Sequence, residues 1–273
     1  MKQIAVFFTL AILLFSCSND DGDDGNQKNN PLLLKIRNNF ATKNQSDFFV
    51  GFEYDNQKRL TKKIGGSLQL DPMTGYSGFY TDQLYTTLVY SKNKVTIENF
   101  DTIEGYTADK KTRYITLNNA GQIVQKDIPP YKGQDYLWYK RIFYTYSGNL
   151  LTEIKTTYPE MPYDPNNPND FIEITLEKFY YDSNGNLSKT ETYDEKNGIS
   201  DNIKVVRIFE DYDNSFNYMK RFYLLEEYFY GSISKNNYRK YREEYYVDDI
   251  MEGSREVNWT YQYDSNGNVI TDF

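Results

Sequence analysis

Apolar and polar side chains alternate through most of the chain after residue 32, which is typical of β-strands with one buried face. The segment 257–263 is an example, because one face would carry Val257, Trp259, Tyr261 and Tyr263. Five further segments are rich in β-branched and aromatic residues, which favour strands: Tyr85–Tyr90, Val95–Ile97, Ile142–Tyr146, Ile172–Leu176 and Val205–Phe209. The pattern predicts about 14 to 18 antiparallel strands. A helix competes only in Met219–Tyr230.

A short motif recurs along the chain. Tyr181–Leu187 (YDSNGNL) returns almost unchanged as Tyr263–Val269 (YDSNGNV). Weaker or shortened copies begin at Tyr54, Tyr90, Leu117, Tyr146 and Tyr212. A degenerate copy near Tyr246–Asp249 would fill the longer gap before Tyr263. Such self-similarity indicates a repeated structural unit, here strand, tight turn, strand.

Two registers compete for the turn of this unit. A two-residue Asn184–Gly185 turn is the common hairpin form, and it would pair Tyr181 with the polar Ser188. A three-residue loop with Gly185 in the left-handed conformation would instead pair Tyr181 with Leu187. Because register follows the hydrophobic pattern, we predict the second arrangement.

Proline is concentrated in one connection. Tyr158–Phe171 contains four of the eight prolines and predicts a stiff, exposed loop. It could mark a domain boundary, but similar repeats on both sides argue against one. We therefore predict an all-β fold, an antiparallel meander of repeated hairpins that forms a long curved sheet or an open barrel. Residues 32–273 would form this single domain.

The N-terminus predicts export and lipidation. Lys2 precedes an apolar run at Ile4–Phe15, which is too short for a spanning helix, and Leu14-Phe15-Ser16-Cys17 resembles a bacterial lipobox. We expect residues 1–16 to be a signal peptide, Cys17 to carry the lipid anchor, and residues 17–31 to be an acidic flexible tether. An ordinary secretory signal and a buried core segment are the alternatives.

Composition excludes several classes of chemistry. The chain has no His, so Ser-His-Asp and Cys-His catalysis and His-ligated zinc are absent. Its single Cys excludes a disulfide within the chain. Aromatic residues make up 17% of the chain, so Tyr and Phe must supply much of the core. With a net charge of −8, we expect no nucleic-acid partner, and the basic stripe Lys235–Arg242 predicts a salt-bridged strand face.

The Tyr-Asp-x-x-Gly-x-Leu turns resemble the YD repeats of Rhs-type surface proteins and of Bacteroidota surface lipoproteins. The resemblance is close at residues 181–187 and 263–269, although Asn186 and Asn268 stand where Rhs-type repeats usually have Arg. It implies a curved antiparallel sheet of successive hairpins, a cell-surface role and contact with carbohydrate. The acidic run Asp20–Asp24 also resembles the surface-export signal of Bacteroidota lipoproteins. We expect an outer-membrane location, with the outer face favoured over the periplasmic one.

Catalytic and metal sites are weakly supported. The oxygen-rich turns at Asp182 and Asp264 lack the Gly and Glu of a calcium loop. Turn side chains that hydrogen-bond their own backbone explain the same residues without a metal. The pairs Glu226-Glu227 and Glu243-Glu244 would point to opposite faces if they lie in strands. We therefore expect no catalytic residues, no metal and no cofactor, and the protein is not expected to be an enzyme.

Exposed aromatic residues are the remaining functional signal, because flat rings can stack on sugars. Tyr136 and Trp138 would share one strand face, and Trp259 is a weaker candidate because its face resembles core. Cross-strand packing explains the same residues without a ligand. The function we favour is a non-catalytic surface module that binds a glycan or peptide. The alternatives are an envelope protein that docks another outer-membrane protein, and, behind both, an acid-catalysed hydrolase.

Overall fold

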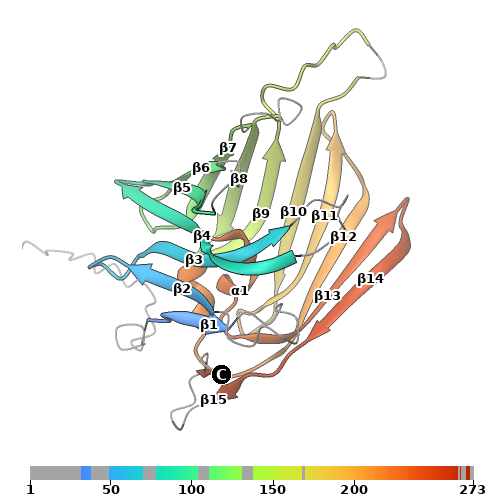
Figure 1. The fold of residues 1–273 in the computed structure, drawn as a ribbon. Coiled ribbons are helices and arrows are strands. Elements are labelled where there is room, and N and C mark those ends of the chain that lie inside the picture. The colour runs from blue at the N-terminus through green and yellow to red at the C-terminus, as the bar shows by residue number, and fades with distance from the viewer. Residues whose placement is uncertain are drawn as a thin grey trace, which may run out of the picture. The chain divides into compact units, whose positions relative to one another are not determined.

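The computed structural model describes residues 32–37, 49–69, 78–103, 111–130, 138–167, 170–263, 265 and 269–270. Fourteen antiparallel strands form one sheet in which each strand pairs with its neighbours in sequence, so β1 and β14 are its two unpaired edges (Figure 1). Two further strands pair separately. These sixteen strands confirm the predicted antiparallel meander and fall within the predicted number.

The strands have the following bounds: β1 Lys35–Arg37, β2 Phe49–Tyr54, β3 Leu60–Gln69, β4 Gly78–Ser91, β5 Lys94–Asp101, β6 Thr112–Leu117, β7 Ile123–Ile128, β8 Lys140–Ser147, β9 Leu150–Thr157, β10 Glu173–Tyr181, β11 Leu187–Lys196, β12 Ile199–Tyr212, β13 Tyr238–Val247, β14 Ile250–Asn258, β15 Gln262–Tyr263 and β16 Val269–Ile270. Three short helical elements lie between β12 and β13: η3 Tyr218–Phe222, η4 Glu226–Tyr228 and α1 Phe229–Ser232. Leu33–Phe273 forms one compact unit.

One face of the sheet carries the core, and we call it the inner face. In β8, Tyr144 is buried while its neighbours Phe143 and Thr145 are exposed, as strand alternation requires. Buried apolar side chains from successive strands continue this face: Phe52, Leu60, Ile97, Ile115, Ile123, Leu151, Phe179, Leu187 and Phe209. The opposite face is called the outer face below.

The predicted three-residue turn is confirmed. Tyr181 pairs with Leu187, the register shifts next to Tyr181, and Gly185 has a φ of +84°. The carboxylate of Asp182 accepts hydrogen bonds from the backbone N–H groups of Asn184 (2.9 Å) and Asn186 (2.8 Å). The oxygen atoms of this turn therefore bond their own backbone, as expected for a structural turn.

Other copies of the motif also form hairpin turns. Tyr54 pairs with Leu60, Leu117 with Ile123, and Tyr263 with Val269, all in the predicted register. The shortened copies pair Tyr90 with Val95 and Tyr146 with Leu151. The copy suspected near Tyr246 is a hairpin too, in which Val247 pairs with Ile250 around Asp248 and Asp249.

The motif copy at Tyr212–Tyr218 does not form a hairpin. Tyr212 pairs with Tyr238, and residues 213–237, called the clamp segment below, leave the sheet between them. Asp213 closes the base of this excursion by accepting hydrogen bonds from Ser215 (Oγ, 2.7 Å) and Asn237 (backbone N, 3.2 Å). Asn217 is fully buried, and its amide donates to the carbonyls of Gly231 (2.6 Å) and Ser234 (2.8 Å). These bonds hold the two ends of the clamp segment together and leave its apolar side chains free to pack on the sheet.

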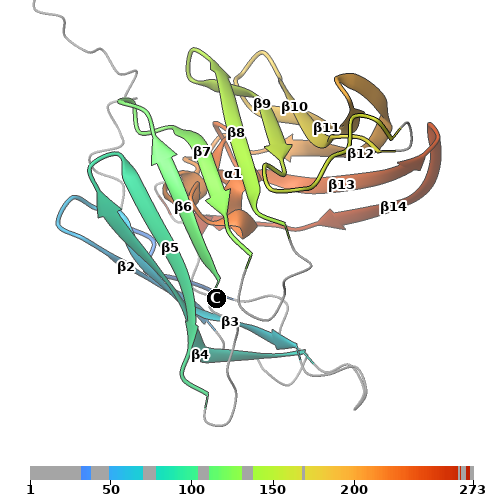
Figure 2. The same ribbon diagram turned by 90° about the horizontal axis from the view of Figure 1, so that it is seen from above.

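The clamp segment packs on the inner face of the sheet (Figure 2). Phe222 stacks on Phe52 of β2 at 4.3 Å between ring centroids, and Phe229 meets Tyr144 of β8 edge to face at 6.0 Å. The ring of Tyr230 stacks on Phe179 of β10, with 6.4 Å between the centroids. Met219–Tyr230, for which the sequence left helix and strand as alternatives, thus contains short helical elements and no strand.

The strand predicted through 257–263 is interrupted. β14 ends at Asn258 and β15 begins at Gln262, so Trp259 and Tyr261 lie outside any strand. Tyr261 instead packs edge to face on Tyr218 of the clamp segment, at 6.1 Å. Of the strand predicted at residues 135–139, Trp138 and Tyr139 precede β8, which begins at Lys140, and residues 135–137 lie outside the described residues.

Candidate functional site

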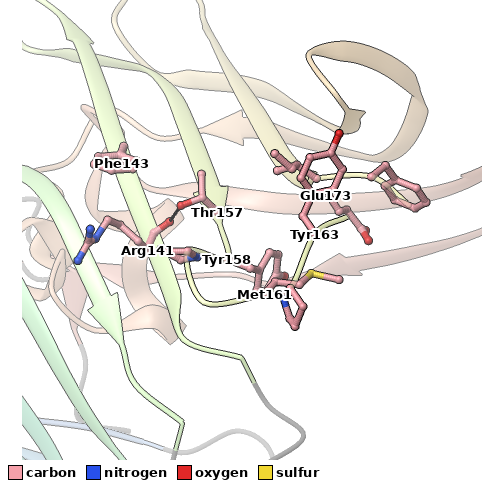
Figure 3. A pocket seen from close by; sticks show the side chains of 11 residues that line it. Arg141, Phe143, Thr157, Tyr158, Met161, Tyr163 and Glu173 are labelled. Carbon is pink, nitrogen blue, oxygen red and sulfur yellow. Dashed lines mark hydrogen bonds between the residues drawn. The ribbon is translucent and has the colours of Figure 1, made fainter. Parts of the chain in front are cut away.

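A pocket of about 350 Å³ opens beside the proline-rich connection between β9 and β10 (Figure 3). We call it the outer pocket. Strands β8 and β9 provide one wall, and lining residues from 158–163 and 171–173 provide the rest. Apolar and aromatic side chains predominate in its lining, among them Phe143, Tyr158, Met161, Tyr163 and Phe171. Its polar lining side chains include Arg141, Thr157 and Glu173.

The strand wall is held by register and hydrogen bonds. Arg141 and Thr157 are paired across β8 and β9, and the Thr157 hydroxyl donates to the Arg141 carbonyl at 3.1 Å, as drawn in Figure 3. The Arg141 guanidinium donates through Nε to Asp127 Oδ1 on β7 at 2.8 Å. Arg141 and Phe143 both lie on the outer face, opposite the buried Tyr144.

The loop wall is ordered by its own polar groups. The N–H of Met161 donates to the Tyr158 carbonyl at 3.1 Å, and the N–H of Asp164 donates to the Asp170 carboxylate at 2.8 Å. At the end of the loop, Ile172 and Asn197 exchange two hydrogen bonds, which tie the loop to the β11–β12 turn. Residues 159–167 are exposed, which confirms the predicted exposed loop.

The exposed rings and the polar groups give the pocket its chemistry. Phe143, Tyr163, Met161 and Ile172 are all exposed, so apolar surface faces solvent at the pocket. Burial raises the pKa of the Tyr158 hydroxyl, with further contributions from Glu173 and Asp194. This hydroxyl therefore stays protonated at neutral pH and can donate a hydrogen bond.

The aromatic residues singled out from the sequence lie elsewhere. Trp138 is 40% exposed, two residues before β8, and the described lining of the outer pocket does not contain it. Trp259 packs edge to face on Tyr238 at 5.2 Å and donates its indole N–H to the Tyr261 hydroxyl at 2.8 Å. Tyr136 and Cys17 lie outside the described residues.

The sequence reasoning missed the lining aromatics of the outer pocket, although a signal existed. Tyr158 and Tyr163 each adjoin a proline, and Phe171 ends the same loop. Proline stiffens a chain and lowers the entropy lost when a neighbouring ring is held in place. Aromatic residues interleaved with prolines in an exposed connection are therefore a usable indication of a binding loop.

Acidic and basic clusters elsewhere are mostly paired. Glu243 and Glu244 lie in β13 as adjacent strand residues, whereas Glu226 and Glu227 lie in η4. The basic stripe is salt-bridged as predicted: Arg239 contacts Asp211 at 2.6 Å, and Lys240 contacts Glu256 at 3.3 Å. Within the described part of the chain, no helix is long and apolar enough to cross a membrane.

No protein-family model and no curated protein matches the sequence. The solved structures that are similar to it include two porin-like proteins. A porin-like protein from Bacteroides uniformis ATCC 8492 is 11% identical, with 86% of this chain and 85% of that chain covered and a TM-score of 0.48. A porin-like protein from Bacteroides vulgatus ATCC 8482 is 13% identical, with 88% and 90% covered and a TM-score of 0.44.

Proposed function

We propose that this protein is a non-catalytic binding module that holds a glycan in the outer pocket. The observation that carries the proposal is the solvent-open, aromatic lining of a pocket of about 350 Å³. That volume lies at the lower end of the range of ligand pockets, roughly 300–1,000 Å³. Ligand pockets combine apolar walls with a few fixed polar groups, and this pocket has both.

The lining matches the two kinds of surface on a sugar. Tyr158 and Tyr163 offer rings for the apolar C–H faces of a pyranose. Arg141, Thr157 and Glu173 offer donors and acceptors for its hydroxyl groups. The loop is held by its own hydrogen bonds, so little ordering entropy should be lost on binding.

Binding without hydrolysis is favoured by the carboxylate content of the pocket. Glycoside hydrolysis generally uses two carboxylates flanking the bond to be cleaved. Among the described residues that line the outer pocket, Glu173 is the single carboxylate. A ligand held there would meet one acidic group.

The experiment is a glycan microarray probed with the mature chain, made soluble by Cys17→Ser. We expect specific binding that Tyr163→Ala weakens at least tenfold, because one stacking ring is lost. Tyr114→Ala is the matched control, since Tyr114 is exposed on β6 and is not part of the described pocket lining. Glycan binding that Tyr163→Ala leaves unchanged would contradict a binding site in the outer pocket.

A second candidate function is docking of another envelope protein. It is favoured by apolar residues exposed together around the β13–β14 turn: Val247, Ile250 and Met251, with Tyr245 beside them. Exposed apolar clusters of this kind commonly mark interaction sites. A blank glycan array, together with crosslinks from Val247 and Ile250 to a single envelope protein, would favour docking over glycan binding.

The location proposed for either function is the outer membrane, with the protein anchored through acylated Cys17 and displayed on the outer face. Support comes from the lipobox-like residues 14–17 and the acidic run after them. The YD-repeat relationship is likewise a proposal, supported by the turn sequences at 181–187 and 263–269.

A further inference from the structure

A second pocket, of about 320 Å³, lies on the inner face, between strands β6–β10 and the clamp segment. We call it the inner pocket. The outer pocket uses other residues, so the inner pocket is a separate candidate site. In the sheet, Lys126 is paired with Ile142 and Ile142 with Thr156, which places these three lining residues side by side on β7, β8 and β9.

The walls of the inner pocket are apolar. Ile115, Ile142 and Ile154 line it from the sheet, and Leu224 and Phe229 line it from the clamp segment. Apolar surface of this kind favours a ligand with C–H faces to bury.

The charged side chains that line the inner pocket, Lys126, Glu177 and Glu226, are each ion-paired. On one side Glu226 Oε1 lies 2.9 Å from Lys126 Nζ and 3.3 Å from Arg113 Nε. On the other side Arg207 lies 3.2 Å from Glu177 and 2.8 Å from Glu243. Each of these three lining charges thus already has an oppositely charged partner, and a charged ligand would have to compete with these ion pairs.

Two lining hydroxyl groups have no partner in the described structure. Tyr144 is 9% exposed and lines the pocket, and its hydroxyl makes no hydrogen bond among the described residues. Burial, and then Glu226, Tyr146 and Glu177, raise the pKa of this hydroxyl, so it remains a neutral donor and acceptor. Thr156 also lines the pocket, and its hydroxyl too lacks a partner in the described region. Both hydroxyls are accessible from the pocket and can hydrogen-bond to a hydroxyl-bearing ligand.

We infer that the inner pocket binds a small, uncharged, polyhydroxylated molecule of one or two sugar rings. Apolar walls, lining charges that are already ion-paired and two accessible hydroxyl groups all favour that class. A purely apolar ligand would leave the hydroxyls of Tyr144 and Thr156 unused, and an ionic ligand would compete with the ion pairs of Lys126, Glu177 and Glu226. The inference stands on the inner pocket alone and does not depend on glycan binding at the outer pocket.

The test is saturation-transfer NMR on the mature Cys17→Ser protein. The neutral probes are glucose, galactose, mannose, N-acetylglucosamine and maltose, and the charged counterparts are glucuronate and glucosamine. We expect at least one neutral probe to bind, and the charged counterpart of a bound monosaccharide to bind at least tenfold more weakly. Absence of binding by every neutral probe, or equal binding of the charged counterparts, would overturn the inference.

Two single-group variants locate the binding. Tyr144→Phe and Thr156→Val each remove one hydroxyl with little change in shape, and each should weaken the bound neutral probe about tenfold. Tyr114→Phe removes an exposed hydroxyl of β6 and should leave the affinity unchanged. Circular dichroism would establish that the variants remain folded.

The outer pocket is tested separately in the same experiment. Neutral-probe binding that Tyr163→Ala removes and Tyr144→Phe leaves intact would contradict the inner site and support the outer one. The reverse result would support the inner site and leave the proposed outer site without support. Should Tyr144→Phe fail to fold, Thr156→Val decides the question alone.

Discussion

At the scale of single residues, the recurrent turn depends on one side-chain oxygen and one left-handed residue. Asp55, Asn118 and Asp182 each accept two backbone hydrogen bonds, from the residues two and four positions later, at 2.8–3.0 Å. The residue three positions later has positive φ in every case: +61° at Lys58, +78° at Gly121 and +84° at Gly185. Lys58 adopts this conformation without being glycine, so the surrounding bonds impose it.

Opposite substitutions at the left-handed position should have opposite effects. Gly185→Ala should lower the free energy of unfolding by about 0.5–1 kcal/mol, the cost of a Cβ at positive φ less the entropic cost of glycine. Lys58→Gly should raise it by about 0.5–1 kcal/mol, the relief of that conformation less the entropic cost of glycine. Urea unfolding monitored by circular dichroism measures both.

Gly253→Ala is the matched control for these two variants. Gly253 lies within β14, its φ is not positive, and an added Cβ would meet nothing within 4 Å. Its unfolding midpoint should not fall. Equal midpoints for Gly185→Ala and the parent protein would contradict the role given to the left-handed turn residue.

At the scale of elements, the clamp segment is attached to the sheet by aromatic packing and by ion pairs at η4. Glu226 contacts Lys126 of β7 and Arg113 of β6, and Glu227 contacts Lys63 of β3. Burial by itself would raise the pKa of Glu226, but Lys126 and Arg113 together lower it below 4.5. The ionised form of Glu226 is therefore the one that holds the clamp segment to the sheet.

This attachment should weaken in acid. Because the pKa of Glu226 is lower in the folded chain, its contribution to stability is present above pH 4.5 and is lost as the pH falls through the folded value. Glu226→Gln should thus lower the urea midpoint at pH 7, and the difference from the parent should shrink towards pH 3. Glu226 is half exposed, so solvent screening makes the effect modest.

Glu252→Gln is the control for the acid experiment, since Glu252 is exposed on the edge strand β14. It should follow the parent protein at both pH values. A Glu226→Gln deficit that is the same at pH 7 and pH 3 would show that the ionised carboxylate is not what fastens the clamp segment.

At the scale of the whole molecule, a single sheet with two unpaired edges must avoid pairing with other chains. The β14 edge carries the charged residues Glu252, Arg255 and Glu256, which disfavour the addition of another strand. Leu33–Phe273 forms a compact unit that contains the sixteen strands found among the described residues. The proposed anchor at Cys17 precedes that unit, so attachment to a membrane and folding of the sheet should be separable.

Cys17→Ser should separate them. In cells that process lipoproteins, the variant should move from the membrane pellet to the soluble fraction and lose labelling by fatty acid. Its thermal unfolding midpoint should match that of the detergent-solubilised parent, because the substitution lies before the compact unit. Persistent sedimentation with the membrane would contradict anchoring through Cys17.

The sequence by itself determined the strand class, the antiparallel meander and the turn register. These features depend on interactions over a few residues: the alternation along a strand, and the hydrogen bonds that Asp182 accepts from the backbone N–H groups of Asn184 and Asn186. Short-range geometry of this kind is nearly independent of the rest of the chain. For that reason the local pattern alone is enough to pair Tyr181 with Leu187 correctly.

Only the tertiary structure decided where the chain leaves the sheet and where its pockets lie. The motif at Tyr212–Tyr218 fails to form a hairpin because Phe222 packs on Phe52 and Glu226 on Lys126, contacts between residues far apart in sequence. Both pockets likewise combine side chains from several separate elements. Burial of apolar surface is non-directional, so a local pattern indicates that a residue will be buried but not which distant partner will cover it.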